Sequence, residues 1–189
     1  PKYFSIEKYS SENKIIKKIL KKKKISFPIV IKPVNEGSSL GVKIVKNYNH
    51  LNKSAKDLFK KYNQLIFEEY IGGQEIQAAV LNSKALGAIE LIPKRSFYDY
   101  KAKYNRSAKT KHIMPANLKK TDYIKVLKIS RRAHKALKCK GVTRADFKFF
   151  KNKFYLLEIN TQPGMTSLSL VPEIPSYCGI TFTNLIEKI

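Results

Sequence analysis

Hydrophobic and polar positions along the chain follow two periods, one typical of helices and one typical of strands. Apolar residues recur every three or four positions, often with lysines between them, and these predicted helices cover residues 10–24, 49–62, 121–138 and 181–189. Short runs rich in β-branched and aromatic residues predict strands at 27–33, 42–45, 64–70, 75–81, 85–92, 142–150 and 154–159. Helices and strands alternate at first and strands then pair locally, which predicts an α/β (α+β) chain with mixed and antiparallel sheets.

Turn residues divide the second half of the chain into hairpins. One predicted hairpin turns at Asn82-Ser83 after the glycine pair Gly72-Gly73, and another turns at Lys151-Asn152-Lys153. Residues 96–114 are polar and aromatic without a period, which predicts a long loop of the kind that usually carries function. The helix at 121–138 should be capped by Thr121. Its expected buried stripe consists of Ile124, Leu127, Ile129, Ala133 and Leu137.

Composition narrows the class of protein. The 189 residues include 38 Lys+Arg against 14 Asp+Glu, a net charge of +24, yet 43% are apolar, which argues against a disordered chain. No apolar run approaches the ~20 residues that cross a bilayer, so we expect no membrane partner. The two cysteines lack metal or redox spacing, which indicates a reducing cytoplasm. The chain starts at Pro1 without an initiator Met, so we expect a fragment.

The positive charge alone would fit a nucleic-acid-binding module. However, the basic residues comprise 33 Lys and only 5 Arg, and they are scattered along the whole chain. Proteins that read phosphates and bases rely on Arg for its bidentate fork. We therefore interpret the lysines mainly as solvated surface and do not favour nucleic acid as a partner.

The last predicted hairpin carries the most informative polar residues. A turn centred on Asn152 places Asp146 opposite Glu158 and Arg144 opposite Asn160, and strand alternation puts all four on one face. Two carboxylates so close repel each other unless a cation lies between them. Carboxylate and amide oxygens are the ligands that Mg²⁺ prefers, and an arginine beside them could neutralise charge on a reacting oxygen. The alternative is a solvated face with an Arg–carboxylate pair.

Two segments in the first half have features of a nucleotide site. Lys32 ends a buried strand and could reach a phosphate, while the following Glu36-Gly37-Ser38-Ser39-Leu40-Gly41 could approach the anion with backbone N–H groups. A flexible turn is an equal alternative. Residues Glu68-Glu69-Tyr70-Ile71 could present backbone groups to a purine, and Glu75 could accept from a ribose hydroxyl. An acidic surface corner is as good an interpretation of that segment alone.

Two loops complete the set of candidate segments. Residues 97–104 hold three tyrosines and two lysines, which could form a lid that excludes water, although such loops are more often plain surface. Residues 160–167 offer a glycine N–H suited to an oxyanion and several hydroxyls. The histidines His50, His112 and His134 have no ligand spacing, and we assign them no role.

The five segments, taken in this order, resemble the D-alanine–D-alanine ligase family of the ATP-grasp superfamily. The resemblance runs along the whole chain and is most specific in Phe97-Tyr98-Asp99-Tyr100-Lys101-Ala102-Lys103-Tyr104, Arg144-Ala145-Asp146-Phe147 and the segment 157–166. It implies an ATP-grasp fold with two subdomains, a central one at residues 1–73 that is truncated at its start and a C-terminal catalytic one at 74–189. The family's N-terminal domain, which anchors the first D-alanine, is not in this sequence, and Gln162 departs from the family pattern.

The resemblance also implies a reaction. ATP phosphorylates the carboxylate of one D-alanine, the amine of a second D-alanine attacks the acyl phosphate, and the dipeptide serves peptidoglycan synthesis in the cytoplasm. The implied ATP residues are Lys32, Glu36, Ser38, Ser39, Glu68, Glu69, Tyr70, Ile71, Glu75 and Lys103. The implied ligands of two Mg²⁺ ions, or of Mn²⁺, are Asp146, Glu158 and Asn160. Arg144 and the N–H of Gly164 would stabilise the tetrahedral intermediate, with Ser38 and Tyr104 in a network that closes the site.

Lys103, Ser169 and Leu170 would receive the second D-alanine. The loop sequence at residues 98–104 favours D-alanine over D-lactate as the acceptor, while D-serine remains open. Another ATP-grasp carboxylate–amine ligase and, from a different class, a basic nucleic-acid-binding module are the alternatives. The resemblance implies a homodimer for the full-length protein.

Overall fold

The computed structural model describes residues 1–7, 13–37, 39–93, 110–166 and 169–189. These residues form two compact units, which divide between Ile71 and Gly72. Each unit has its own sheet and its own hydrophobic core.

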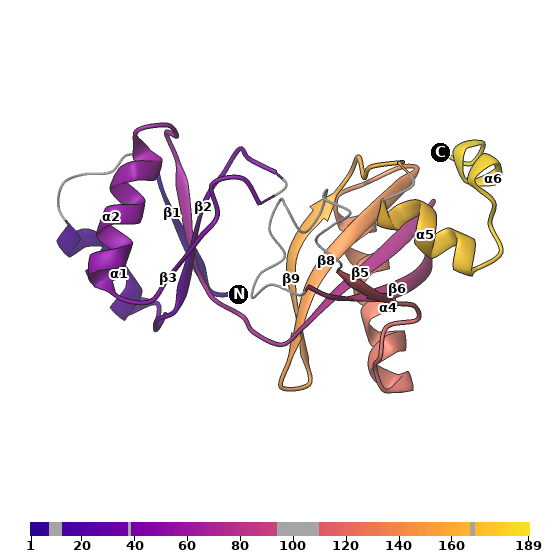
Figure 1. Ribbon diagram of the computed structural model, residues 1–189, viewed down its shortest axis with the longest axis horizontal. Helices are drawn as coiled ribbons and strands as arrows, with labels where there is room; N and C mark the ends of the chain where they lie inside the picture. The colour runs from indigo at the N-terminus through magenta and orange to yellow at the C-terminus, as the bar shows by residue number, and fades with distance from the viewer. Residues whose placement is uncertain (8–12, 38, 94–109, 167–168) are drawn as a thin grey trace. The chain divides into compact units, whose positions relative to one another are not determined.

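The first unit is a four-stranded antiparallel sheet covered on one face by two helices (Figure 1). The strand order is β1 (Tyr3–Ile6), β4 (Leu65–Glu69), β2 (Ile29–Pro33) and β3 (Lys43–Val45). Helices α1 (Asn13–Lys22) and α2 (Tyr48–Phe59) bury their apolar stripes against this sheet. The core combines residues of both helices with the inward-facing residues of the strands: Phe4, Ile16, Leu20, Ile29, Ile31, Val45, Leu51, Ala55, Leu58, Leu65 and Phe67.

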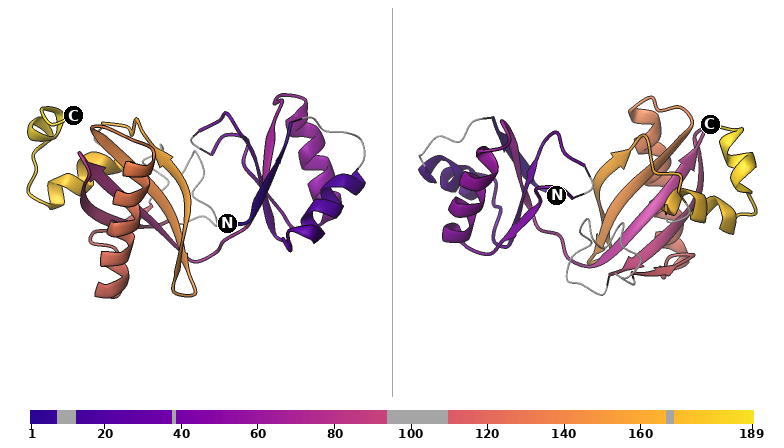
Figure 2. Two further views of the ribbon diagram at one scale, coloured as in Figure 1. Left: turned by 180° about the vertical axis from the view of Figure 1, so that it is seen from behind. Right: turned by 45° about the horizontal axis from the view of Figure 1, so that its top comes forward.

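The second unit is a five-stranded antiparallel sheet. Its strand order is β7 (Lys111–Ile113), β6 (Lys84–Ile92), β5 (Gln74–Leu81), β8 (Val142–Phe150) and β9 (Lys153–Asn160). Helix α4 (Lys120–Ala136) packs on one face, and α5 (Leu170–Tyr177) packs on the other, followed by the short α6 (Phe182–Ile186) (Figure 2).

Strand alternation divides the second sheet into two chemically different faces. The face under α4 is apolar and includes Ile76, Ala78, Ala145 and Phe147, all fully buried. The other face, here called the polar face, carries polar side chains at alternate positions of β5, β8 and β9. These residues are Glu75, Gln77, Arg144, Asp146, Lys148, Glu158 and Asn160.

The glycine turn before β5 is fixed by a close backbone approach. Gly73 has φ +85°, and a Cβ built there would lie 2.2 Å from the carbonyl oxygen of Phe149 on β8. Only glycine fits this position, because any side chain would collide with the β8 backbone. The chain can therefore approach β8 closely at Gly73, and β5 begins at the next residue.

Most predicted elements are present with slightly shifted ends, but some expectations were wrong. The predicted all-loop segment contains the strand β7, and the sequence pattern missed β1 and α5. Helix α4 begins after Lys119, which makes no side-chain capping bond, so the expected Thr121 cap is not formed. Among the described residues, no helix is long and apolar enough to cross a membrane.

The buried stripe of α4 also differs from the prediction. The fully buried residues are Val126, Ser130 and His134. Leu127 and Ile129 are partly buried and pack against the core as predicted, whereas Ile124 is 42% exposed and Leu137 is 59% exposed. The buried positions follow one another at exact four-residue spacing, and polar residues occupy two of them because each has a hydrogen-bond partner. The Ser130 hydroxyl donates to the Val126 carbonyl, and His134 Nδ1 lies 2.9 Å from Thr143 Oγ1.

Candidate functional site

The register of the β8–β9 hairpin brings the predicted polar residues together. Asp146 is paired with Glu158, and Arg144 with Asn160, as expected from the sequence. The turn, however, has only two residues, Lys151 and Asn152, both with positive φ. A hairpin with this turn and no irregularity would place Asp146 opposite Leu157 and turn Glu158 to the apolar face.

A β-bulge restores the predicted pairing. The register shifts by one residue between Asp146 and Phe147, where Phe147 is paired with Leu156 and Asp146 with Glu158, so Leu157 is the extra residue. Because of the bulge, Phe154 and Ile159 both pack against the apolar core although they are five positions apart. The bulge therefore places the oxygen-bearing side chains of both strands on the polar face.

Arg144 and Asp146 form a bidentate ion pair on the polar face. Arg144 Nε donates to Asp146 Oδ1 at 2.7 Å, and Nη2 donates to Oδ2 at 3.0 Å. The two side chains are only 14% and 8% exposed. Two parallel charge-assisted hydrogen bonds in this low-dielectric position hold the carboxylate in a fixed orientation. The Arg–carboxylate pair weighed from the sequence is thus formed, but on a face whose strands also place Glu158 and Asn160 beside it.

The oxygen donors of the site fit a hard divalent cation. Glu158 lies directly across from Asp146, and Asn160 Oδ1 accepts from the backbone N–H of Gln162 at 3.0 Å, which orients the amide oxygen. In the described part of the chain, no three His, Cys, Asp or Glu residues converge, so the donor set is two carboxylates and one amide. An oxygen-only set of this kind suits Mg²⁺ and not Zn²⁺.

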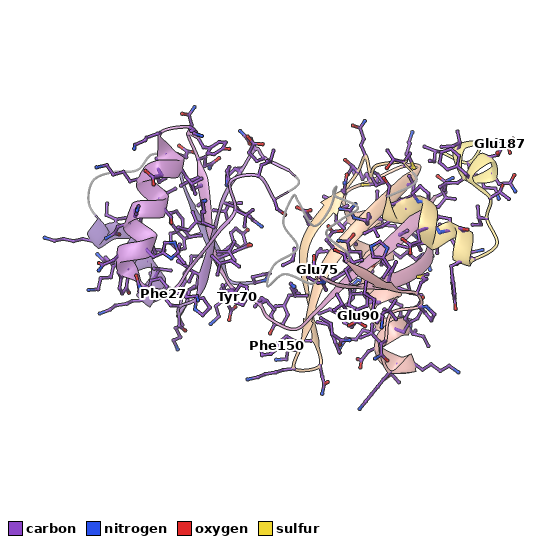
Figure 3. The ribbon with its side chains drawn as sticks, viewed as in Figure 1. Phe27, Tyr70, Glu75, Glu90, Phe150 and Glu187 are labelled. Atoms are coloured by element: carbon purple, nitrogen blue, oxygen red, sulfur yellow. The ribbon has the colours of Figure 1, made fainter. Side chains whose placement is uncertain are left out.

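Two further residues of the polar face were not singled out from the sequence. Lys148 Nζ lies 2.9 Å from Oε2 of Glu75, its register partner on β5, and both side chains are largely buried. Glu75 is labelled in Figure 3. Gln77 is paired with Asp146 and is 1% exposed. Lys148 follows Arg144 and Asp146 at two-residue spacing, so strand alternation could have placed it on the same face. Gln77 could have been noticed as the one polar residue within the run 76–81.

In the first unit, Lys32 and Glu68 lie on the sheet face opposite the helices. Lys32 Nζ is 3.0 Å from Glu68 Oε1, and their side chains are 23% and 12% exposed. Glu69 is on the other side of β4, where its carboxylate accepts from the Lys2 backbone N–H at 3.4 Å. Of the two adjacent predicted carboxylates, only Glu68 therefore shares a face with Lys32. Tyr70 and Ile71 follow β4, and Ile71 is buried.

The glycine-rich segment after β2 forms turns. The Leu40 N–H donates to the Gly37 carbonyl at 2.9 Å, and Ser39 has φ +62°. Glu36 is exposed. Gly37 has no heavy atom within 4 Å of a built Cβ, so its backbone is open to a ligand.

The segment before α5 is held by hydroxyl groups. Ser169 Oγ accepts from the Thr166 N–H at 3.1 Å, and the two hydroxyls lie 2.9 Å apart. A Cβ on Gly164 would lie 2.8 Å from the same Ser169 oxygen, so Gly164 and Ser169 are adjacent. Leu170, the first residue of α5, is buried. Ser38 and the whole of the expected lid at residues 97–104, which includes Lys103 and Tyr104, lie outside the described residues.

Two titratable groups of the second unit have shifted pKa values. Burial lowers the pKa of His134, whose Nε2 has no hydrogen-bond partner among the described residues. Burial raises the pKa of Tyr123, whose hydroxyl accepts from the Ala88 N–H at 3.1 Å. Both residues lie on α4, on the face of the sheet opposite the candidate site, so they concern stability and not the chemistry of the polar face.

Comparisons with known proteins agree on one family. The family model described as "D-ala D-ala ligase C-terminus" matches residues 1–189. A D-alanine–D-alanine ligase of Pelagibacter ubique (strain HTCC1062) is 57% identical over 189 residues, which are 100% of this chain and 61% of that protein. The chain thus spans about three fifths of the length of this relative.

Solved structures share the fold along the whole chain. A D-alanine–D-alanine ligase from Bacillus anthracis complexed with ATP superimposes with a TM-score of 0.79 at 30% identity, covering 100% of this chain and 59% of that one. The VanG D-Ala:D-Ser ligase from Enterococcus faecalis gives a TM-score of 0.84 at 28% identity, with 100% and 55% covered. The expected α/β fold of the ATP-grasp ligases is therefore confirmed.

Proposed function

Because this chain belongs to the D-alanine–D-alanine ligase family, we propose that it is the ATP- and metal-binding part of a ligase that joins two D-alanine molecules. In this proposal the γ-phosphoryl group of ATP passes to the carboxylate of one D-alanine. The amine of the second D-alanine then attacks the acyl carbon, and inorganic phosphate leaves as the peptide bond forms. The two units would be the central and C-terminal ATP-grasp subdomains, and the dipeptide would serve peptidoglycan synthesis.

The observation that carries the proposal is the pairing of Asp146 with Glu158, next to Arg144 and Asn160, on one face of the hairpin. Asp146, Glu158 and Asn160 would hold two Mg²⁺ ions, with Mn²⁺ as a substitute. The cation, when bound, offsets the negative charge of the phosphates. The chain contributes fixed ligand positions, because the bulge sets the strand register and the Arg144 fork and the Gln162 N–H orient two of the three donors.

The nucleotide would be bound by residues of both units. Lys32 would hold phosphates, supported by its fixed position against Glu68. The segment Glu68-Glu69-Tyr70-Ile71 would line the adenine, and Glu75 would accept from the ribose. Glu36, Ser38 and Ser39 belong to the loop proposed to approach the phosphates, where the open backbone at Gly37 supports that role.

The acyl chemistry would use donors near the end of β9. Arg144 and the N–H of Gly164 would stabilise the oxyanion of the tetrahedral intermediate. Ser169 and Leu170 would receive the second D-alanine together with Lys103, which would also contact the transferred phosphate. Ser38 and Tyr104 would form the network that closes the site. The adjacency of Gly164 and Ser169 supports a shared substrate pocket for this segment.

The test is phosphate release from ATP by the protein that carries this chain, with and without D-alanine. Release should require D-alanine, and Asp146→Asn or Glu158→Gln should lower it at least a hundredfold. Asp57→Asn and Glu187→Gln are matched controls, because these carboxylates lie on the exposed surface. Release that does not depend on D-alanine, or that survives both site substitutions, would contradict the proposal.

The identity of the acceptor is decided by a second arm of the same assay. The similarity to a D-Ala:D-Ser ligase, at a TM-score of 0.84, means that the fold supports either acceptor. D-serine should replace D-alanine poorly as the second substrate, and equal product formation from both would favour the D-Ala–D-Ser alternative. A nucleic-acid-binding role is not favoured, because the family match extends over the whole chain.

Cytoplasmic location and a homodimer of the full-length protein are further parts of this proposal. They rest on the family and on the substrates, since ATP is a cytoplasmic metabolite. Light scattering of the full-length protein should give twice the mass of one chain, and a monomeric mass would refute the dimer.

A further inference from the structure

Gln77 is buried on the polar face, and its side-chain oxygen lacks the hydrogen bond that such a group normally accepts. It lies on β5 directly beside Asp146, its register partner on β8, and is 1% exposed. Its Oε1 atom is fully buried, and among the described residues no group donates to it. Gln74, on the opposite face of the same strand, donates to Glu90 Oε1 at 3.0 Å and to the Asn117 carbonyl at 3.1 Å.

An unpaired amide oxygen in this position is costly. Buried polar side chains are almost always hydrogen-bonded, and an exception calls for a partner that the protein alone does not supply. A leucine or methionine would fill the same space between Asp146 and Ile89, the two register neighbours of Gln77, without that cost. The missing partner must be a donor, because a carboxamide oxygen only accepts.

The cations of the polar face are engaged elsewhere. Arg144 donates to both carboxylate oxygens of Asp146, and Lys148 donates to Glu75. The position next to Asp146 is also where the proposed function puts a divalent cation. Mg²⁺ bound by only one or two carboxylates keeps several water molecules, and water on a cation is a strong hydrogen-bond donor.

We infer that Gln77 is a positioning residue of the metal site, whose Oε1 accepts a hydrogen bond from a water molecule on the cation held by Asp146. The inference rests on the proposed function, since it needs a cation at Asp146. Gln77 thus adds a hydrogen-bond acceptor on β5 to the metal-ligating oxygens that β8 and β9 provide. Partners of this outer kind fix the orientation of the directly bound groups.

The test compares two glutamines of one strand that face opposite ways. Mn²⁺ binding is measured on the full chain by electron paramagnetic resonance with the ATP analogue AMP-PNP, and thermal unfolding is measured without metal. Gln77→Leu should raise the Mn²⁺ dissociation constant about ten- to a hundredfold. The same substitution should raise the melting temperature by about 2–8 °C, because it removes an unpaired buried oxygen.

Gln74→Leu is the matched control. It should lower the melting temperature, since Glu90 and the Asn117 carbonyl lose a donor, and leave the Mn²⁺ dissociation constant unchanged. Gln77→Glu keeps an acceptor at the same place and should retain Mn²⁺ binding within a few fold, while its added buried charge lowers the melting temperature in the absence of metal.

The outcomes separate the inference from the function on which it rests. If the unsubstituted chain binds no Mn²⁺, the proposed metal site is wrong and the role of Gln77 falls with it. If it binds Mn²⁺ and Gln77→Leu binds equally well, the metal site stands and the inference is overturned. Loss of binding in both Gln77→Leu and Gln77→Glu would also overturn it, because the acceptor would then not be the group that matters.

Discussion

The ion pair between Arg144 and Asp146 stabilises the site in the absence of a metal ion, and this can be tested with Arg144→Met. Methionine keeps the length and packing of the arginine stem but removes every donor. Asp146, which is only 6% exposed, then lies opposite Glu158 without a compensating cation. Removing one partner of a buried ion pair costs about 3–5 kcal/mol.

We take the lower end of that range for Arg144→Met, since both side chains retain some contact with water. The free energy of unfolding should fall by about 3 kcal/mol, which is a melting temperature about 6–12 °C lower for a chain of this size. A divalent cation should reverse part of the loss, because it replaces the positive charge that the guanidinium supplies to Asp146. A tenfold gain in metal affinity would add about 1.4 kcal/mol of stability at saturating metal.

The assay is urea unfolding, followed by circular dichroism, with and without saturating Mg²⁺. The exposed pair between Lys60 and Asp57, at 3.3 Å, provides the control. Lys60→Met should change the free energy of unfolding by about 0.5 kcal/mol or less, with no dependence on Mg²⁺. An equal stabilisation by Mg²⁺ in Arg144→Met and in the unsubstituted chain would refute the reasoning, because the cation would then not compensate the charge of Asp146.

Three further predictions concern the second unit. Burial lowers the folded-state pKa of His134, so the unfolded chain binds more protons than the folded chain below about pH 6.5. The free energy of unfolding should therefore fall with decreasing pH in that range, by at most about 1.4 kcal/mol per pH unit. His134→Gln should lose this pH dependence. Gly73→Ala should lower the free energy of unfolding by more than about 1 kcal/mol, because its Cβ would collide with the Phe149 carbonyl at positive φ. Deleting Leu157 alone should keep Mn²⁺ binding, since Asp146 would still face Glu158, whereas deleting Leu156 and Leu157 together should abolish it.

Each of these has a control or a contradicting result. An unchanged pH dependence in His134→Gln, with the exposed His50→Gln as the control, would show that another group titrates. The same substitution at the uncrowded Gly37, Gly37→Ala, should cost much less than Gly73→Ala. Retained Mn²⁺ binding after the double deletion would mean that Glu158 is not a ligand.

The sequence predicted the pairing of Asp146 with Glu158 but not the way in which it is achieved. Alternation along two strands and a turn near Asn152 were sufficient to place four polar residues on one face. A turn at residues 151–153 was predicted, but its shortening to two residues and the compensating bulge at Leu157 were not, because two adjacent leucines are compatible with either a longer turn or a bulge. The register depends on how both strands fit the core, where Phe154 and Ile159 must point the same way.

The stripe of α4 shows the opposite case. Counting apolar residues favoured Ile124 and Leu137, yet both are exposed, and His134 takes a core position. A histidine is accepted there because Thr143 on β8 pairs with it, and that contact between distant segments is not visible in a helical period. Short β7 was missed for a similar reason, since three residues with no pattern of their own form a strand only because β6 provides hydrogen-bond partners.

Local spacing and residue chemistry by themselves determined most of the helices and strands of the chain, its hard oxygen donors and the order of segments that identifies its family. These properties depend on neighbours along the chain, so the sequence contains them directly. The packing of the folded chain alone decided which polar residues would be buried together: Glu75 with Lys148, His134 with Thr143, and Gln77 beside Asp146 with no donor of its own. Burial and hydrogen-bond satisfaction depend on residues far apart in sequence, and it is these that separate a polar strand face from a site prepared for a ligand.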